Sequence, residues 1–442
     1  MLAILANRTY RHLFAAQVIA LTGTGLMTVA LALLAYELAG ANAGAVLGTA
    51  LAIKMIAYVS IAPLAGDLAG KLPRRAFLVS LDLIRAAIAV ALPFVDQVWQ
   101  IYILIALLQS ASAAFTPTFQ ATIPDILTKE EDYTRALSLS RLAYDLENLL
   151  SPTLAALLIG IFGFHWLFGG TVIGFLASAA LVLSVTLPRP AGGAPERGTR
   201  RTGKGIRIYL ATPRLRGLLA LNLAVAAAGA MVIVNTVVLV RGIGLGNSDV
   251  ALALASFGGG SMVAAIVLPR LLDRIGDRPV MIPAAAVMSV LLLVFAIVTR
   301  GGPVSMLWPV LLAVWALLGA AYSATQVPTG RLLRRSAHPE DRPSLFAAQF
   351  ALSHACWLIT YPLAGWLGTV AGMPVTLLAL GVIAALGTAL AFVLWPAADP
   401  ETVPHDHPEL GSNHPHLAGG RASHSHTYMI DELHRHWPVP SR

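Results

Sequence analysis

The sequence has few charged residues for its length. Only 12% of its 442 residues are Asp, Glu, Lys or Arg, whereas 57% are hydrophobic. A soluble domain carries about 25% charged residues, which it needs to cover its surface. The composition therefore excludes a soluble enzyme and favours an all-α polytopic membrane protein, in which each crossing of the bilayer takes about 20 mostly apolar residues.

Cysteine is almost absent, since Cys356 is the only one in the chain. Disulfides within the chain and thiolate metal clusters are thus excluded. The sequence also lacks the G-x-x-x-x-G-K-S/T loop that holds nucleotide phosphates, and it offers no nucleophile paired with a base. We therefore expect neither an enzyme nor ATP-driven transport, and no bound cofactor.

Long apolar runs are abundant in the body of the chain. Periodicity and hydropathy predict twelve transmembrane helices, at residues 11–37, 44–69, 76–96, 99–122, 137–162, 165–187, 216–240, 249–272, 279–299, 304–327, 344–368 and 374–395.

The basic residues orient these spans. With the N-terminus in the cytoplasm, 26 of the 30 Lys and Arg residues fall on the cytoplasmic side, two on the other side and two within spans. Cytoplasmic loops carry an excess of Lys and Arg. The count therefore supports twelve spans with both termini in the cytoplasm, and it gives the net charge of +8 a topological meaning without nucleic acid.

The spans divide into two similar halves. The segments 66–75 and 269–278 correspond at an offset of 203 residues, and Pro152 corresponds to Pro362 at an offset of 210. Two parallel six-helix repeats with a substrate site between them are the plan of a secondary transporter. We expect an N-terminal six-helix half at 1–187, a cytoplasmic basic linker at 188–215, a C-terminal six-helix half at 216–395 and a cytoplasmic histidine-rich tail at 396–442.

The corresponding loops resemble a signature of the major facilitator superfamily, G-x-x-x-D-R-x-G-R-R. The first copy departs from it, with Gly70 where the acid belongs. The resemblance implies a twelve-helix transporter whose two loops lock the cytoplasmic gate through charge contacts. The gate residues that it implies are Gly66, Lys71, Arg74 and Arg75 in the first copy and Asp273, Arg274, Gly276 and Arg278 in the second.

The fifth span resembles the helix-five motif of the antiporter branch, G-x-x-x-G-P-x-x-G-G. Its small residues and proline are Ser151, Pro152, Ala155 and Ala156, while Glu147 replaces the first glycine. Small residues allow close helix approach around a proline bend. The segments 7–14 and 82–86 are similar to the drug and siderophore efflux branch, which includes nickel-resistance exporters of the Nre type with histidine-rich C-terminal tails.

Ionisable residues within spans are candidates for function, because a charge inside the bilayer costs several kcal/mol. The candidates for proton or substrate coupling are Lys54, Asp82, Arg85, Asp145, Glu147 and His354. Asp82 and Arg85 share a helix face, so they form either a structural ion pair or part of a relay. Glu147 is the first candidate for the proton-carrying group and His354 the second, because buried carboxylates and histidines titrate near neutral pH.

The tail carries eight of the twelve histidines, arranged as four His-x-His doublets. Imidazole without thiolate suits Ni, Co, Zn or Cu(II). Prolines and glycines keep the segment from becoming a helix, except that 428–437 has apolar residues at helical spacing and could dock on the body or the membrane. The predicted metal ligands are His405, His407, His414, His416, His424, His426, His434 and His436.

The sequence therefore predicts a monomeric multi-pass exporter in a bacterial inner membrane. Its expected substrate is nickel, or cobalt in second place, moved outward against protons. Two alternatives stay open: an exporter of a drug or siderophore, with aromatic residues lining its cavity, and a membrane metal sensor or scaffold that hardly transports. The expected partners are the lipid bilayer, protons and the transported solute.

Overall fold

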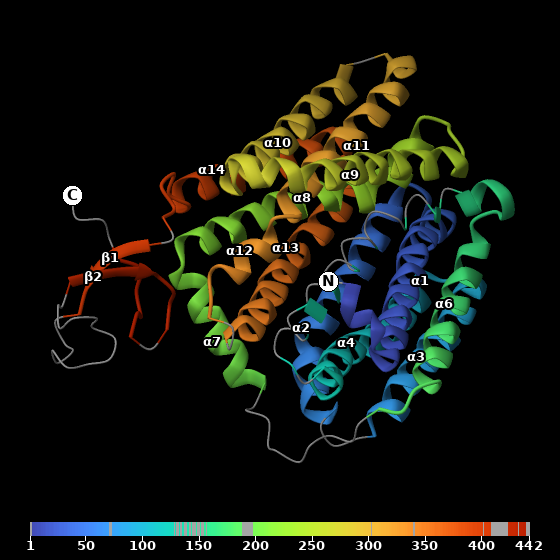
Figure 1. Ribbon diagram of the computed structural model, residues 1–442. Coiled ribbons are helices and arrows are strands. Elements are labelled where there is room, and N and C mark those ends of the chain that lie inside the picture. Colours follow the sequence, from blue (N-terminus) through green and yellow to red (C-terminus); the bar gives the residue numbers. More distant parts are fainter. Residues whose placement is uncertain are drawn as a thin grey trace.

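The protein is described by a computed structural model (Figure 1). It describes residues 2–69, 73–127, 129, 132, 135–136, 139–140, 143, 147, 151, 154–155, 157–187, 198–301, 303–338, 341–400, 402–407, 423–431 and 433–438.

Eleven long helices in the described part of the chain coincide with predicted spans. The described residues of the remaining predicted span, the fifth, are helical up to Phe162. In the first half the helices are α1 (Arg8–Ala39), α2 (Ala43–Ala69), α3 (Arg74–Ala91), α4 (Val98–Ile126) and α6 (His165–Leu183). In the second half they are α8 (Pro213–Gly242), α9 (Asn247–Ile275), α10 (Arg278–Gly301), α11 (Val304–Gln326), α13 (Arg342–Val370) and α14 (Met373–Leu394).

Hydropathy supports a membrane location for most of these helices. Within the described residues, nine helical stretches are long and apolar enough to cross a bilayer, and one of them, Arg8–Ile61, extends over parts of both α1 and α2. The outer surface exposes large apolar side chains such as Ile297 (72% exposed) and Val393 (75% exposed). Lipid can cover such side chains because the helices satisfy their own backbone hydrogen bonds.

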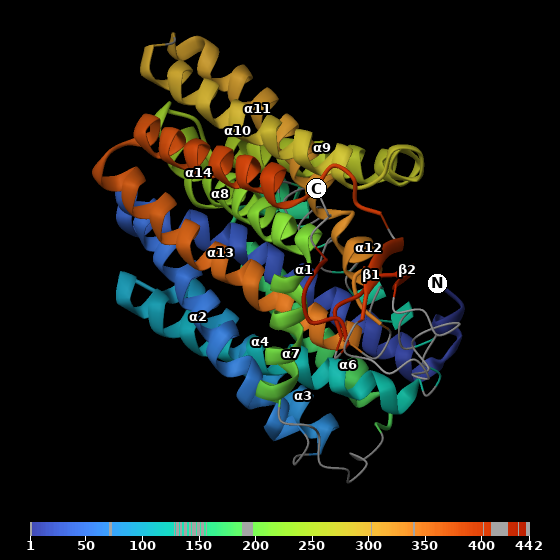
Figure 2. The ribbon, with the colours of Figure 1, turned by 90° about the vertical axis from the view of Figure 1, so that its left-hand side faces the viewer.

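The packing of helices repeats between the halves (Figures 1 and 2). In the first half α1 packs against α6, α2 against α4, and α3 against α6. In the second half α8 packs against α14, α9 against α11, and α10 against α14. These are the same pairs displaced by six spans, so the fold has the predicted pseudo-symmetry.

The two halves meet closely where α2 crosses α13. Glycines make this approach possible, because a Cβ on Gly48 would lie 2.5 Å from the Tyr361 carbonyl oxygen and one on Gly365 would overlap the Gly44 backbone. The Asn235 side chain of α8 donates to the Ala364 carbonyl at 3.0 Å beside this contact. We call the end of the bundle with this contact the far end; the opposite end, where the halves are joined, is the linker end.

Part of the predicted linker is a helix. Residues Gly198–Ala211 form helix α7, which packs against α13 at the linker end. Tyr209 is fully buried and its hydroxyl donates to Gln349 at 2.5 Å, while Lys204 pairs with Asp341 at 2.5 Å. Buried apolar residues on one face of α7 give this part of the linker a tertiary partner, which stabilises the helix.

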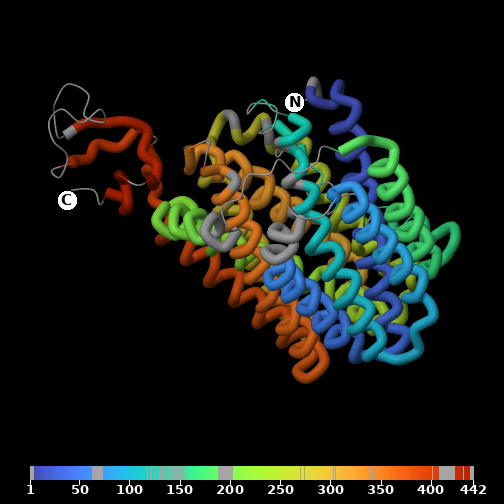
Figure 3. The backbone as a smooth tube through the Cα atoms, turned by 90° about the horizontal axis from the view of Figure 1, so that it is seen from below, coloured from blue at the N-terminus to red at the C-terminus, as the bar shows by residue number. Residues whose placement is uncertain are grey.

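The tail contains the described strands of the protein, β1 (Thr402–Asp406) and β2 (Ser423–Thr427). They pair antiparallel, with His405 opposite His424 and Val403 opposite His426. The hairpin lies beside the helical bundle in Figure 3. The all-α expectation holds for the body but not for the tail, where alternating Thr, Val, Ser and His residues and internal prolines favour extended chain.

The final described segment does not form the helix that the spacing of its apolar residues indicates. Residues 428–438 are irregular, with a turn in which the Asp431 amide donates to the His434 carbonyl at 3.1 Å. The segment still docks on the body, because Tyr428 and Ile430 are buried in a core that also contains helix residues. The predicted docking is present without the predicted helix.

Candidate functional site

Lys54 and Glu147 form the charged centre of the bundle. Lys54 lies in α2 and Glu147 in the fifth span, and the two side chains attract each other electrostatically. Both are half-buried. The sequence could not name a partner for Lys54, and the structure supplies Glu147. A buried charge needs such a counter-charge, because desolvation alone would be costly.

Aromatic side chains of both halves meet one helical turn from Lys54. His354 of α13 stacks on Tyr58 of α2, with ring centroids 5.6 Å apart, and on Phe350 at 3.9 Å. Tyr58 lies one helical turn after Lys54, and Tyr361 interacts with both Glu147 and Tyr322. The two leading predictions for the proton-carrying group, Glu147 and His354, thus lie at the same interface between the halves.

His354 has a local partner of its own. Its Nδ1 lies 2.7 Å from the Phe350 carbonyl oxygen, one turn earlier in α13, so Nδ1 carries the proton and donates. The remaining Nε2 of a neutral imidazole is an acceptor. His354 can therefore accept a proton at Nε2 while it keeps its position in α13.

The small residues of the fifth span are packed against α1. A Cβ on Gly25 would overlap the Ser151 side chain and lie 3.5 Å from Cγ of Glu147. Ser151 and Ala155 are buried. This is the close approach that the helix-five motif implies, and it fixes the backbone that carries Glu147. Asp145, Pro152 and Ala156 lie outside the described residues.

Asp82 and Arg85 form a buried ion pair inside the first half. Ser178 donates to Asp82 Oδ2 at 2.7 Å, and the Arg85 guanidinium lies over the rings of Phe115 and Phe175, at 4.3 and 4.5 Å from their centroids. These partners come from α3, α4 and α6. Asp82 and Arg85 therefore form an ion pair that links three helices. Their role in coupling stays a prediction.

The first gate motif makes contacts within its own half. Arg74 pairs with Asp125 at the end of α4, and Arg75 donates to the Leu183 carbonyl at the end of α6. Gly66 lies in the last turns of α2. Lys71 is outside the described residues. Asp125, which the sequence analysis missed, supplies a carboxylate to the motif that has Gly70 in place of its acid.

The second gate motif belongs to a larger network. Gly276 ends α9 with φ +79°, a left-handed conformation that glycine adopts without strain. Arg274 is exposed. Asp273 lies in α9, but its side chain is not among those that the structure describes. Arg278 donates through Nε to the Trp395 carbonyl at 2.8 Å.

The acid that holds this network together is Asp277, which the sequence analysis did not single out. It is 4% exposed and pairs with Arg331 at 2.6 Å and with Arg335 at 3.9 Å. Arg335 also pairs with Asp399. Asp399 is remote in sequence, so only folding brings it to the gate.

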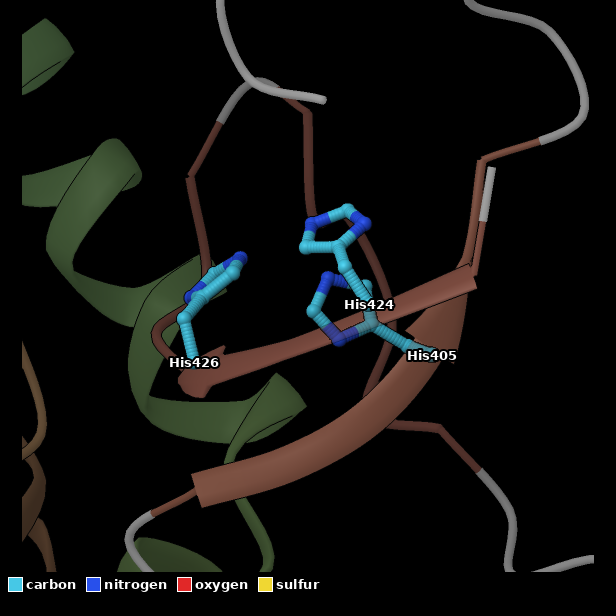
Figure 4. Close-up of side chains that lie close together, drawn as sticks. All are labelled: His405, His424 and His426. Atoms are coloured by element: carbon cyan, nitrogen blue, oxygen red, sulfur yellow. The ribbon is translucent and has the colours of Figure 1, made fainter. Parts of the chain in front are cut away.

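The tail histidines gather on one face of the hairpin. Residues two apart in a strand point to the same side, so His405 shares its face with His407, and His424 with His426. The antiparallel register then brings the two doublets together, with ring centroids of His405 and His424 only 4.6 Å apart (Figure 4). His434 joins them from the following turn, 4.9 Å from His405.

Two sets of three imidazoles can hold a metal ion. One is His405, His424 and His426, and the other is His405, His407 and His434, with the nitrogens of each set within 4.8 Å of one another. His436 is exposed and contributes its carbonyl oxygen to a hydrogen bond from Tyr428. His414 and His416 lie outside the described residues. Both sets draw on more than one doublet, so the structure joins the predicted doublets into a single cluster.

The nitrogen separations in the second set fit a common ion. Nε2 of His434 lies 3.0 Å from Nε2 of His405 and 3.2 Å from Nε2 of His407. Two imidazoles bound to one ion at about 2.0–2.1 Å, at tetrahedral to octahedral angles, place their nitrogens roughly 2.8–3.4 Å apart. The geometry thus matches adjacent ligands of one transition-metal ion.

The other ring nitrogens of His405 and His434 have acceptors as neighbours. Nδ1 of His405 lies 2.9 Å from the Val403 carbonyl oxygen, and Nδ1 of His434 lies 3.0 Å from an Asp431 carboxylate oxygen. Each Nδ1 therefore carries the proton of the neutral ring, and each Nε2 is the nitrogen that can act as a ligand. A carboxylate behind a histidine orients its ring and raises its basicity as a metal ligand.

Burial disfavours the charged forms of two of these histidines. Desolvation lowers the pKa of His405 and of His434, and the neighbouring imidazoles lower both further. The pKa of Asp431 is lowered despite its desolvation, because the His434 amide and ring donate to it.

Known proteins agree with the fold. The sequence model of the Major Facilitator Superfamily matches residues 13–246 and 218–426. The structure resembles the nucleoside transporter NupG, with a TM-score of 0.62 and 14% identity over 87% of this chain and 98% of that one. It also resembles a D-xylose–proton symporter, with a TM-score of 0.61 and 14% identity over 89% of this chain and 97% of that one.

Curated relatives match shorter stretches. Macrolide efflux protein A of Enterococcus faecalis is 26% identical over 153 residues, 32% of this chain and 47% of that protein. Macrolide efflux protein A of Streptococcus pyogenes is 25% identical over 182 residues, 40% of this chain and 44% of that protein. The chain thus spans less than half the length of these relatives.

Proposed function

Because the chain belongs to the major facilitator superfamily, we propose that it is a proton-coupled exporter of a divalent transition-metal ion, nickel first and cobalt second. The observation that carries this proposal is the imidazole cluster of the tail, with Nε2 atoms 3.0 and 3.2 Å apart. Imidazole nitrogen without sulfur suits nickel and cobalt, and also Zn and Cu(II). The metal is cargo here, and no resident cofactor is proposed.

Coupling is proposed to rest on Glu147. Its carboxylate attracts Lys54 in the centre of the bundle. A proton, a metal cation and the Lys54 ammonium compete for this one carboxylate, so binding of one displaces the others. Because Glu147 and Lys54 lie beside residues of the opposite half, this exchange can accompany the rocking of the halves that gives alternating access.

The orientation belongs to the same proposal. We propose that both termini and the tail lie in the cytoplasm of a bacterial cell, with the transporter in the inner membrane as a monomer; the excess of basic residues on one side supports the orientation. The tail would then meet cytoplasmic metal before transport. Its ligands are neutral and convergent, which supports a role in collecting the ion.

A second candidate is the export of an amphiphilic organic molecule. The observation that favours it is the aromatic group around the interior pair, with Tyr58, Phe350 and His354 stacked together. Apolar and aromatic walls with a few polar groups are typical of organic ligand sites. The macrolide efflux relatives support the same alternative.

Transport in inverted membrane vesicles separates these candidates. An imposed proton gradient should drive nickel uptake into vesicles that contain the protein, and Glu147→Gln should abolish it. Glu37→Gln is the matched control, because Glu37 is an exposed acid at the far end whose described partner, His165, lies 3.8 Å away.

Each candidate function predicts a different outcome of the vesicle experiment. Uptake of a macrolide or dye without nickel uptake would assign the organic substrate and refute metal export. Nickel binding to the tail without uptake of either solute would support a sensor or scaffold. Full nickel-driven proton release by Glu147→Gln would rule out that acid as the coupling group. Deletion of residues 401–442 that leaves uptake and resistance at full strength would refute collection by the tail.

A further inference from the structure

The tail is tied to the body at a residue that belongs to the gate network. The guanidinium carbon of Arg214, in the first turn of α8, lies 5.2 Å from the centroid of the Trp437 ring. Trp437 packs edge-on against Tyr428, with centroids 5.2 Å apart, and Tyr428 is buried. A cation is attracted to the face of an indole, and more strongly where both are desolvated. The contact is therefore a real attachment of the tail.

Arg214 passes this attachment to the gate residues. Its side chain is 2% exposed, and it binds Asp399 at 3.0 Å and Ser336 at 2.9 Å. Asp399 in turn pairs with Arg335, which also reaches Asp277. Arg214 is thus connected through Asp399 and Arg335 to Asp277, the acid beside the second gate motif, and Trp437 is connected to it through Arg214.

A second connection starts at the metal cluster itself. One carboxylate oxygen of Asp431 accepts from Nδ1 of His434 at 3.0 Å, and the other lies 3.6 Å from Nε2 of His338. The Asp431 side chain is also fixed by the amides of Leu433 and His434, at 2.8 and 2.7 Å. His338 belongs to the connection between α12 (Thr329–Arg334) and α13, two residues after Ser336. Asp431 is therefore a positioning residue shared by the cluster and the body.

From these two connections we propose that metal binding by the tail clamps the linker end of the C-terminal half, so that occupancy of the cluster controls the gate network around Asp277. An ion that joins His434 to His405 and His407 fixes the turn at Asp431 and holds Trp437 against Arg214. Without the ion, the turn lacks this cross-link to His405 and His407. This inference rests on the proposed metal binding by the tail.

Thermodynamic linkage makes the proposal measurable. If the bound ion strengthens docking by a given factor, docking must strengthen binding of the ion by the same factor. Trp437 and His338 are not members of either ligand set. Substituting them should nevertheless weaken metal binding, which a tail that binds metal independently of the body would not show.

Hydrogen exchange on the full-length protein in lipid nanodiscs tests this, with nickel or with EDTA. Nickel should slow exchange in the tail segment 423–437 and also in 331–338 of the body, by about fivefold or more, the low end of ordinary coupling between sites. Trp437→Ala should keep part of the tail protection, lose the protection of 331–338, and weaken nickel binding by a similar factor. His338→Ala changes a residue of the body and none of the tail. It should also remove the protection of 331–338 and weaken nickel binding.

Trp166→Ala is the matched control, since Trp166 is 66% exposed at the far end of the bundle. Nickel protection that stops at the tail in the wild type, or unchanged nickel affinity in both Trp437→Ala and His338→Ala, would overturn the clamp and leave metal binding intact. Absence of any nickel protection in the tail would refute metal binding itself, and the clamp with it.

Discussion

Glu147 in the interior faces one cation, Lys54, whereas His434 in the tail faces other imidazoles. The interior pair can exchange a single charge, as a coupling site must, but in the part of the chain that the structure describes it is not among the groups of three metal-binding side chains. Both such groups lie in the tail. This difference fits the proposed division of labour, in which the interior pair couples transport and the tail binds the metal ion.

The largest effect is expected in the interior. Glu147→Gln keeps the size of the side chain but removes its negative charge, so neither a proton nor a cation can compete with Lys54. We expect proton-coupled transport of any substrate to fall about 100-fold or more, as for loss of a positioned proton-transfer group. Uptake into inverted vesicles measures this, and retention of coupled transport would break the assignment of coupling to the interior.

The next effect concerns the tail alone. His434→Ala removes a ligand whose Nε2 faces two other imidazoles, and nickel affinity of the tail should fall by about 100-fold, the upper range for perturbing a metal site. Titration calorimetry on the full-length protein measures the affinity. His436→Ala is the control, because the His436 ring is exposed. Equal losses in both variants would contradict the cluster geometry.

A smaller effect is expected from the carboxylate behind the cluster. Asp431→Asn retains an oxygen acceptor but loses the charge that orients His434, so nickel affinity should fall by about 10-fold. Asp406→Asn provides the comparison, since Asp406 is exposed in β1. If both variants bind as the wild type does, Asp431 has no positioning role.

The smallest effect is a shift in the pH at which half of the nickel binding is lost. The pKa of His405 and of His434 is lowered from 6.5 by burial. Protons compete with metal only where these rings charge, so half-loss of nickel binding should lie below pH 6.5. The unfolded tail takes up protons first, so the stability of the folded tail declines as pH falls through 6.5 toward the lowered values. Nickel titrations over a pH series measure the midpoint, and a midpoint above 6.5 would contradict a buried neutral cluster.

The sequence predicted the gross fold because bilayer crossing imposes length and hydropathy on each span separately. It also indicated the histidine doublets, whose two-residue spacing already favours one face of a strand. It missed α7, where Tyr209 gains a buried partner only after α13 is in place. It missed Asp125, Asp277 and Asp399 as gate acids for the same reason, since their partners lie far away in the chain.

The sequence by itself determined the class of the protein: twelve apolar spans, two related halves and an imidazole-rich tail. Only the tertiary structure decided which side chains contact each other. It gave Lys54 its partner Glu147, joined separate histidine doublets into one cluster, and brought Trp437 to Arg214. The physical reason is that hydropathy and periodicity are local properties of a segment, whereas ion pairs and metal ligands depend on distances between segments, which packing alone sets.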